Sequence, residues 1–181
     1  RQMCIRDRIL KRQTLRLNSL SDILLKLSSL DANKDLMKKE EIRLDELVAY
    51  ALDSLTLKES TKLEISDDLK ENIIYGDFYW LAEALINILK NADNRPNCQK
   101  ISLSSYKNPL YTNLIIEDDG GGIDEDNIKK IFKRFYKTPD SRGFGIGLAM
   151  AKTIVEKNNG EISVTNSDKG ASFEIKFYNV T

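Results

Sequence analysis

Three stretches of this sequence place polar residues or glycines at spacings that could do chemistry. In the first, Glu83, Asn87 and Asn91 recur every four residues, so on a helix all three side chains point the same way. An asparagine oxygen can ligate Mg²⁺, a hard cation that prefers oxygen ligands. Because the apolar residues Leu85 and Leu89 lie beside this stripe, it predicts a polar groove along an apolar helix face. A solvated face, or buried amides with satisfied hydrogen bonds, explains the pattern equally well.

The second stretch, 115–123, is an apolar run that ends in Asp118, Asp119 and three glycines. Glycine has no Cβ, so the backbone can turn sharply there and approach a ligand closely. A carboxylate at the end of a strand can accept a hydrogen bond from an exocyclic amine such as that of adenine. An ordinary Asp/Gly turn is common, so this stretch alone is only moderately specific.

The third stretch, Gly143-Phe144-Gly145-Ile146-Gly147-Leu148, opens a helical pattern that runs to Lys157. Free backbone N–H groups and the positive end of the helix dipole favour phosphate there. The spacing fits neither a Walker loop, which needs Gly-Lys-Ser/Thr, nor the Rossmann fingerprint, which follows a buried strand. Aromatic and basic residues alternate over 131–137, between the two glycine stretches. We therefore predict a phosphate-binding loop that this segment covers.

The first element expected to support these stretches is a long amphipathic helix from Ile9 to about Lys39, where the sequence has no proline or glycine. Its apolar stripe is broader than a strict coiled-coil seam, which favours a helical bundle. A helix packed on its own domain is the alternative. The seam residues are Leu10, Leu17 and Leu24, offset by Leu20 and Leu27 and widened by Ile23 and Leu30.

The rest of the chain alternates irregularly between strand and helix patterns. This predicts an α+β fold, a two-layer α/β sandwich with helices on one face of a mixed sheet. We expect two domains, residues 1–40 and residues 41–181. Strands are expected at 42–44, 62–66, 72–75, 100–106, 113–117, 161–165 and 171–178, and helices at 47–55, 78–92 and 145–157.

Composition excludes several classes of protein. The 28 basic and 28 acidic side chains cancel, so no long-range field draws the surface to nucleic acid or to an anionic membrane. The two cysteines are too few for a disulfide framework or a zinc cluster, and no apolar run approaches the roughly 20 residues that span a bilayer. With no histidine, the chain has no histidine-based catalysis and no phosphate acceptor of that type.

Taken in order, these stretches resemble the histidine kinases within the family that also contains the ATPase component of DNA gyrase, Hsp90 and the mismatch-repair ATPase MutL. The resemblance covers nearly everything from Glu41 onward and implies a Bergerat-type ATP-binding fold preceded by a long dimerisation helix. Residues 83–92 are similar to the N box, 118–123 to the first glycine box, 132–136 to the F box that marks the kinases, 143–148 to the second glycine box, and 16–45 to the second dimerisation helix with its exit.

The resemblance implies roles for individual residues. Asn87 would bind Mg²⁺, and Asn91 would approach the phosphates of ATP. Asp118 would hold the adenine amino group, with a water shared with Ser172, and Glu83 stands where the ATP-hydrolysing relatives activate water. The other implied contacts are Gly120, Gly122 and Ile123 around the base, Gly145, Ile146, Gly147 and Leu148 around the phosphates, and Tyr136 and Lys137 on the lid, with Arg134 and Arg142 as further contributors.

Two features depart from the family pattern. Asn94 and Arg95 stand where the family often has a basic residue and then an aromatic one, so its phosphate and ribose contacts are not carried over to this end of the helix. The loop between Tyr136 and Gly143 is short. We therefore expect a lid that covers ATP incompletely until a partner docks.

The function implied by the resemblance is transfer of the γ-phosphoryl group of ATP to an imidazole nitrogen, with Mg²⁺ and the phosphate cradle supplying positioning and charge neutralisation. Because the sequence starts at Arg1 and a helix is already running by Ile9, we expect a truncated N-terminus and residues 1–8 that need not be native. In the full-length parent we expect a homodimer through the N-terminal helix, a response regulator as partner, and a cytoplasmic location with any membrane anchor in missing upstream segments.

Two alternatives stay open at this point. One is an ATPase or a Ser/Thr kinase of the anti-sigma type from the same superfamily. The other is a dimerising interaction module whose nucleotide pocket is vestigial. The F-box-like segment 132–136 argues against the first, and the intact Asn87, Asp118 and Gly145 set argues against the second.

Overall fold

The structure, a computed structural model, describes residues 2–32, 37–138 and 143–179. The chain divides into two compact units, Arg1–Asp35 and Leu36–Thr181. Within the described ranges, no helix is both long enough and apolar enough to cross a membrane.

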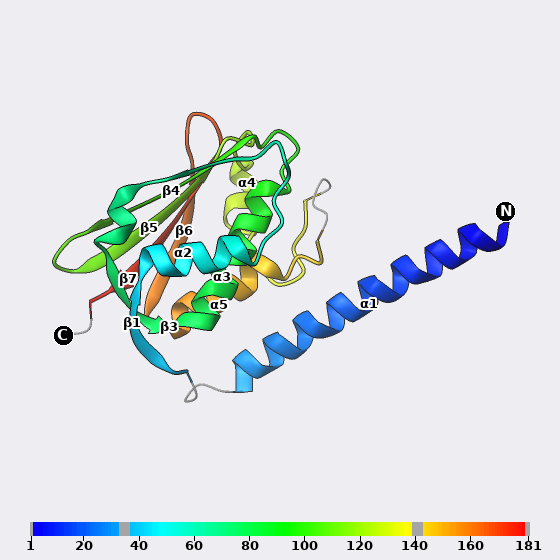
Figure 1. Cartoon of the computed structure of the whole chain (residues 1–181), viewed down its shortest axis with the longest axis horizontal. Coiled ribbons are helices and arrows are strands. Elements are labelled where there is room, and N and C mark those ends of the chain that lie inside the picture. Colours follow the sequence, from blue (N-terminus) through cyan, green and yellow to red (C-terminus); the bar gives the residue numbers. More distant parts are fainter. Residues whose placement is uncertain (1, 33–36, 139–142, 180–181) are drawn as a thin grey trace. The chain divides into compact units, whose positions relative to one another are not determined.

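The first unit consists of the helix α1 (Gln2–Ala32), blue in Figure 1. Its seam leucines Leu10, Leu17 and Leu24 are 63%, 66% and 42% exposed. The sequence-based prediction of a long helix is confirmed, but the predicted end was wrong: α1 ends at Ala32, and Lys39 already belongs to a strand. Hydrophobic periodicity predicts the presence of a helix more accurately than the residue at which it ends, because the terminal residues contribute little to the pattern.

The second unit is built on a mixed five-stranded sheet with the spatial order β2-β4-β5-β7-β6. Strand β2 pairs parallel with β4, and the remaining neighbours pair antiparallel. A separate antiparallel pair joins β1 (Lys39–Arg43) to β3 (Ile73–Asp77). The mixed sheet predicted from the sequence is confirmed. Its strands are β2 (Lys62–Ile65), β4 (Lys100–Lys107), β5 (Tyr111–Asp118), β6 (Gly160–Asn166) and β7 (Ala171–Tyr178).

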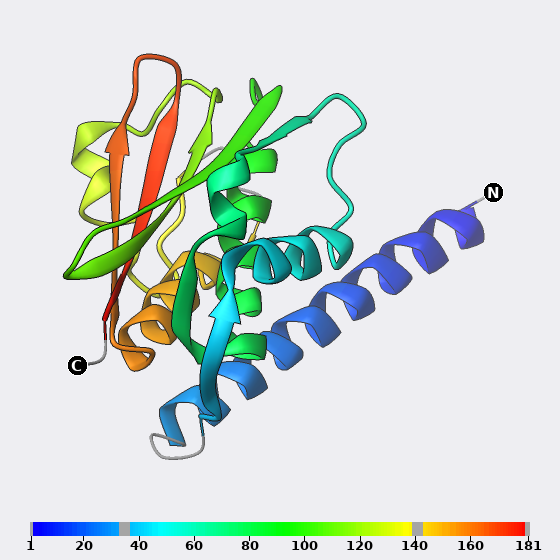
Figure 2. The same cartoon turned by 60° about the vertical axis from the view of Figure 1, so that its left-hand side comes forward.

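Three helices, α2 (Leu44–Asp53), α3 (Phe78–Asp93) and α5 (Gly147–Lys157), lie on the same face of this sheet (Figures 1 and 2). Burial alternates along β4 and β7, as expected for a sheet with one covered face. Each large side chain buried in the layer between contributes about 1.5–3 kcal/mol. The two-layer α+β sandwich is therefore confirmed. Fully buried members of this core include Leu85, Ile88, Leu89, Leu103, Leu114, Ile116, Ile154, Val155 and Phe173.

Several element boundaries differ from the sequence-based expectation. Leu44, expected at the end of a strand, is the first residue of α2. Helix α5 begins at Gly147, not at Gly145, because Gly145 has a φ of +72°, which is incompatible with a right-handed helix. Two four-residue helices, the 3₁₀ helix η1 (Asp67–Lys70) and α4 (Glu125–Ile128), were not predicted, since one turn is too short to show a period.

Candidate nucleotide-binding site

The polar stripe predicted on α3 is present. Glu83, Asn87 and Asn91 are half-buried, whereas the apolar positions around them are buried. The Nδ2 group of Asn87 donates a hydrogen bond to the Glu83 carbonyl at 2.9 Å. The Asn87 Oδ1 atom points at the start of α5, where a Cβ on Gly147 would come within 2.9 Å of it. A side-chain oxygen therefore lies at the N-terminus of the helix predicted to hold phosphate.

That N-terminus begins at an apolar residue, which cannot cap the first backbone donors of the helix. Ile146 is the N-cap of α5 and makes no capping hydrogen bond from its side chain within the described structure. The first N–H groups of a helix have no partner inside the helix, so a bound anion satisfies them. Gly147 and Leu148 are half-buried, which leaves the start of α5 partly accessible. This end of the site suits phosphate.

The lid residues Tyr136 and Lys137 are brought next to Gly145. The amide of Phe135 donates to the Gly145 carbonyl at 2.7 Å, and a Cβ on Gly145 would lie 2.5 Å from the Tyr136 carbonyl oxygen. The Tyr136 hydroxyl donates to Oδ1 of Asn127. The F-box-like segment and the second glycine stretch therefore form one connected loop structure. Of the other predicted contributors, Arg134 is exposed, and Arg142 lies outside the described residues.

Asp118 lies at the end of β5 and is almost fully buried, with 4% of the residue exposed. Its Oδ1 atom accepts from the amide of Gly120 at 2.9 Å. Its Oδ2 atom is buried without a hydrogen-bond partner in the described part of the chain. Burial raises the pKa of this carboxyl, and the nearby Arg95 guanidinium and the backbone amides of Gly120 and Ala171 act in the opposite direction. A buried acceptor without a partner is costly, so the site suits a ligand that brings a donor, such as the adenine amine.

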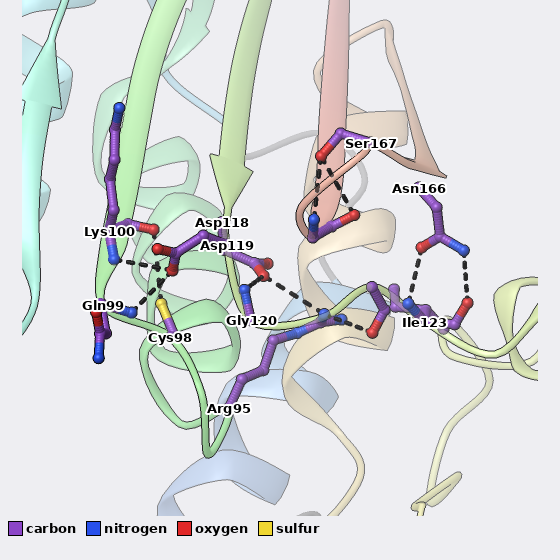
Figure 3. Close-up of polar contacts among 12 residues, drawn as sticks. Arg95, Cys98, Gln99, Lys100, Asp118, Asp119, Gly120, Ile123, Asn166 and Ser167 are labelled. Carbon is purple, nitrogen blue, oxygen red and sulfur yellow. Dashed lines mark hydrogen bonds and ion pairs between the residues drawn. The ribbon is translucent and has the colours of Figure 1, made fainter.

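The loop from Gly120 to Ile123 is held in shape by its neighbours (Figure 3). Ile123 exchanges two hydrogen bonds with the Asn166 side chain: its amide donates to Oδ1, and its carbonyl accepts from Nδ2, both at 2.7 Å. The amide of Gly121 donates to the Lys169 carbonyl at 3.1 Å. Gly121 and Gly122 have φ values of +90° and +76°, a region that favours glycine. Gly122, one of the two glycines predicted around the base, and Gly121 therefore allow the sharp backbone turn of this loop.

Three other residues complete this end of the site. Ser172 is half-buried and lies opposite Glu117 in the register of β5 and β7, beside Asp118. Gly170 lies against the backbone of Asp118, since a Cβ there would come within 1.8 Å of the Asp118 carbonyl oxygen. Arg95 donates from Nη1 to the Gly122 carbonyl at 2.8 Å. Sequence patterns gave none of Gly170, Asn166 and Arg95 a role in the site, although Gly170 was expected in a hairpin turn and Arg95 departs from the family pattern.

Helix α3 connects the two ends of the site. Asn87 lies against the phosphate end at α5, and Arg95, just beyond the C-terminus of α3, contacts the loop after β5. Asn91 lies one turn from Asn87, about 6 Å along the helix axis. One helix thus fixes the spacing between the Asp118 end and the α5 end of the candidate site.

Comparisons with known proteins agree with this geometry. Residues 76–180 match the family described as "Histidine kinase-, DNA gyrase B-, and HSP90-like ATPase". The sensor protein RprX of Bacteroides fragilis is 27% identical over 165 residues, which are 85% of this chain and 32% of RprX. The sensor protein kinase WalK of Staphylococcus aureus is 30% identical over 166 residues, which are 85% of this chain and 39% of WalK. The chain thus spans less than half the length of these relatives.

A solved structure extends the likeness to the fold. The Acinetobacter baumannii histidine kinase AdeS superposes with a TM-score of 0.68 and 25% identity, covering 92% of this chain and 80% of that one. The family match covers more than half of the 181 residues and includes α3, the Asp118 loop and the start of α5. The chain therefore belongs to the family of histidine kinase-, DNA gyrase B- and HSP90-like ATPases and contains its ATP-binding domain.

Proposed function

We propose that this chain is the catalytic part of a sensor histidine kinase, which binds Mg-ATP and transfers its γ-phosphoryl group to a histidine on a dimerisation helix that this chain does not contain. The buried Oδ2 atom of Asp118, which lacks a partner in the described structure, carries the proposal. It offers a single acceptor at the end of a strand, beside a glycine loop. The adenine amine is a donor that would satisfy it.

The phosphate end supports the same conclusion. The N-terminus of α5, which the Ile146 side chain does not cap, offers backbone donors, and the Oδ1 atom of Asn87 lies beside it. An amide oxygen suits Mg²⁺, which takes oxygen ligands, and Asn87 would hold the ion there. When bound, Mg²⁺ neutralises part of the phosphate charge. Asn91 and the lid residues Tyr136 and Lys137 would approach the remaining phosphate oxygens, and the Ser172 hydroxyl would share a water with Asp118.

In the chemical step, no residue of this chain needs to form a covalent bond to the transferred phosphoryl group. An imidazole nitrogen attacks the γ-phosphorus and ADP leaves, so the site mainly positions ATP and stabilises charge. Glu83 lies one turn before Asn87, and its carbonyl oxygen orients that asparagine. Its carboxylate is our candidate for a base at this end of the site.

The wider assignment rests on α1 and on the relatives. The exposure of Leu10, Leu17 and Leu24 on α1 supports a homodimer in the full-length parent. The sensor proteins among the relatives support two-component signalling, with a response regulator as partner. We further propose a cytoplasmic location, with any membrane anchor in segments of the parent that this chain does not contain. The same relatives favour a histidine kinase over an anti-sigma-type kinase or a vestigial module.

Nucleotide titrations test the base-binding end. ATP should bind in the presence of Mg²⁺ at least about tenfold more tightly than inosine triphosphate (ITP), because a hydrogen bond to a charged acceptor contributes about 1.5–3 kcal/mol. ITP has a carbonyl oxygen in place of the amine. Asp118→Ala should remove this preference and lower the affinity for ATP by about tenfold or more. Chelation of Mg²⁺ should weaken the binding of both nucleotides.

Asp67→Ala is the matched control, because Asp67 is an exposed carboxylate that pairs with Lys70 on the surface. This variant should bind both nucleotides as the unmodified chain does. Equal affinities of the unmodified chain for ATP and ITP, or an unchanged preference in Asp118→Ala, would contradict the proposal.

A further inference from the structure

Arg95 connects the end of β5 to the glycine loop that follows it (Figure 3). Its Nη1 atom donates to the Gly122 carbonyl at 2.8 Å and lies 3.4 Å from Oδ1 of Asp118. The side chain of Arg95 is 14% exposed, and that of Asp118 is 1% exposed. The aliphatic part of Arg95 lies against Gly120, where a Cβ would come within 2.8 Å of its Cδ atom. One side chain therefore contacts the carboxylate and two glycines of the loop.

The two oxygens of Asp118 have different surroundings. Oδ1 accepts from the Gly120 amide at 2.9 Å and faces the Arg95 guanidinium. Oδ2 has no partner in the described part of the chain. The contacts with Arg95 and with the Gly120 amide therefore both use Oδ1 and leave Oδ2 unengaged. In this arrangement Arg95 orients the carboxylate through Oδ1 and does not compete with a ligand amine for Oδ2.

We propose that Arg95 is a positioning residue for adenine recognition: by binding Oδ1 of Asp118 and the Gly122 carbonyl, it holds the carboxylate in place and directs Oδ2 at the exocyclic amine. The inference rests on the proposed function, because it assumes that Asp118 binds adenine. Arg95 itself would touch neither the amine nor the reacting phosphate. Its effect reaches the nucleotide through Asp118 and the loop.

The electrostatics of Asp118 make the proposal testable by pH. Burial raises the pKa of this carboxyl, and Arg95 is the main influence that lowers it. Asp119 also acts on this carboxyl and raises its pKa further. The buried Cys98 thiol before β4 also faces this region, and Asp118 contributes to the raised pKa of that thiol. Without Arg95, the pKa of Asp118 should rise. A protonated Asp118 has a donor, which suits the carbonyl oxygen of ITP better than the amine of ATP.

The experiment compares the ATP and ITP affinities of the full chain with Mg²⁺ between about pH 5 and about pH 8.5, a range that begins just above the ordinary carboxyl pKa. Both nucleotides carry the same triphosphate, so its own titration cancels in the ratio of their affinities. In the unmodified chain the preference for ATP should decline only toward the acid end. In Arg95→Ala the midpoint of that decline should move to higher pH by about one unit or more.

Two further variants separate charge from structure. Arg95→Lys keeps a cation near Asp118 and should return the midpoint toward that of the unmodified chain. Arg43→Ala removes an arginine that pairs with Asp45 and Glu46 on the surface and should leave the midpoint unchanged. If Arg95→Ala unfolds too readily to titrate, Arg95→Gln, which retains a donor without the charge, should show the same upward shift.

Three outcomes of these titrations would overturn the inference. An unchanged midpoint in Arg95→Ala or Arg95→Gln, with the preference for ATP retained, means that Arg95 does not govern the state of Asp118. Equal weakening of ATP and ITP at every pH means that Arg95 has only a structural role. An unmodified chain that prefers neither nucleotide at any pH contradicts the adenine site itself, which is a failure of the proposed function and so of this inference with it.

Discussion

In the ligand-free protein, several neighbouring residues already contact Asp118. Gly170, in the turn between β6 and β7, lies so close that any Cβ there would overlap the Asp118 carbonyl oxygen. Arg95 and the Gly120 amide take Oδ1 of Asp118. These contacts fix the rotamer of the carboxylate in the free protein, so a ligand does not have to order it, which favours affinity.

Asn166 should matter to nucleotide binding although it lies outside the predicted site. Its two hydrogen bonds to the backbone of Ile123 hold the loop that borders Asp118. In Asn166→Ala, the free energy of unfolding should fall by about 1–2 kcal/mol, the usual net contribution of two hydrogen bonds. Affinity for ATP should fall several-fold, because the loop becomes free to leave its bound shape. Chemical denaturation and ATP titration measure the two effects.

Asn179 provides the control for this prediction. Its side chain also bonds two backbone carbonyls, those of Asn108 and Pro109. It follows Tyr178, which pairs with Tyr111 at the end of the sheet opposite to Asp118. Asn179→Ala should cost similar stability and leave the affinity for ATP unchanged. Equal losses of ATP affinity in both variants would mean that general destabilisation, not the loop, explains the effect.

The site residues that could be predicted from the sequence differ in kind from those that could not. Asp118 was predictable, because an acid at the end of an apolar strand and before three glycines is a local pattern. Arg95 and Asn166 act on partners 27 and 43 residues away, so no local spacing marks them. The one available signal for Arg95 was its departure from the family pattern, which marks a position without assigning it a contact.

At the level of elements, the F-box-like segment is attached to the rest of the domain at both ends. The Phe132 ring packs edge-on against Phe173 of β7 at 6.4 Å, with the ammonium of Lys152 over its face at 5.6 Å. At the other end, Phe135 has a φ of +65° and donates its amide to Gly145. This positive φ strains a non-glycine residue by roughly 1–2 kcal/mol, which the surrounding contacts must offset.

Gly145→Ala should disable the phosphate end. A Cβ there would lie 2.5 Å from the Tyr136 carbonyl oxygen, at a residue whose φ is +72°. The strain of about 1–2 kcal/mol and the overlap together force the loop to shift, and each 1.4 kcal/mol is about tenfold in affinity. ATP affinity, measured by titration, should therefore fall by about tenfold or more.

Gly143→Ala is the comparison within the same glycine stretch. A Cβ on Gly143 would meet no heavy atom of the described residues within 4 Å, and the backbone there does not have a positive φ. This variant should bind ATP nearly as tightly as the unmodified chain. If both alanine variants bind ATP equally well, the close approach of Gly145 to Tyr136 is irrelevant to the site.

The order of the helices and strands was more predictable than the contacts between the loops that connect them. The strong helix over residues 78–92 and the hairpin at 171–178 follow from periodicity and turn residues, and both appear as α3 and β7. The contact between segment 132–136 and Gly145 was not predictable, because it depends on Phe135 and Gly145, two residues with positive φ whose backbones form a hydrogen bond. Such a meeting leaves no repeating pattern in the sequence.

At the scale of the whole molecule, the chain combines a candidate nucleotide site with a helix whose apolar stripe is exposed at its seam leucines but buried at Leu27 and Leu30. Leu10, Leu17 and Leu24 of α1 are all more than 40% exposed. An exposed stripe of this kind favours association with complementary helices. The chain also lacks histidine entirely. The phosphate acceptor of the proposed reaction therefore lies outside these 181 residues.

We predict that this chain cannot form phosphohistidine on itself, however tightly it binds ATP. A helix that carries a histidine and complements the α1 seam, added in trans as a peptide, should become labelled when the mixture receives ATP with a labelled γ-phosphate. Acid treatment distinguishes the products, because phosphohistidine is acid-labile and phosphoesters are stable. The acid-labile label should appear on the added helix alone, and a helix whose histidine is replaced by alanine should remain unlabelled.

Three labelling patterns separate the competing functions by chemistry. Acid-labile label on the helix requires an imidazole nitrogen to have attacked the γ-phosphorus, which only a histidine kinase arranges. Acid-stable label on this chain itself would place the phosphate on a hydroxyl and support a Ser/Thr kinase of the same family. Tight, Asp118-dependent binding of ATP without labelling of any histidine-bearing helix would leave the nucleotide site intact but contradict phosphoryl transfer, because the bound γ-phosphate would then have no acceptor that the α1 seam can present.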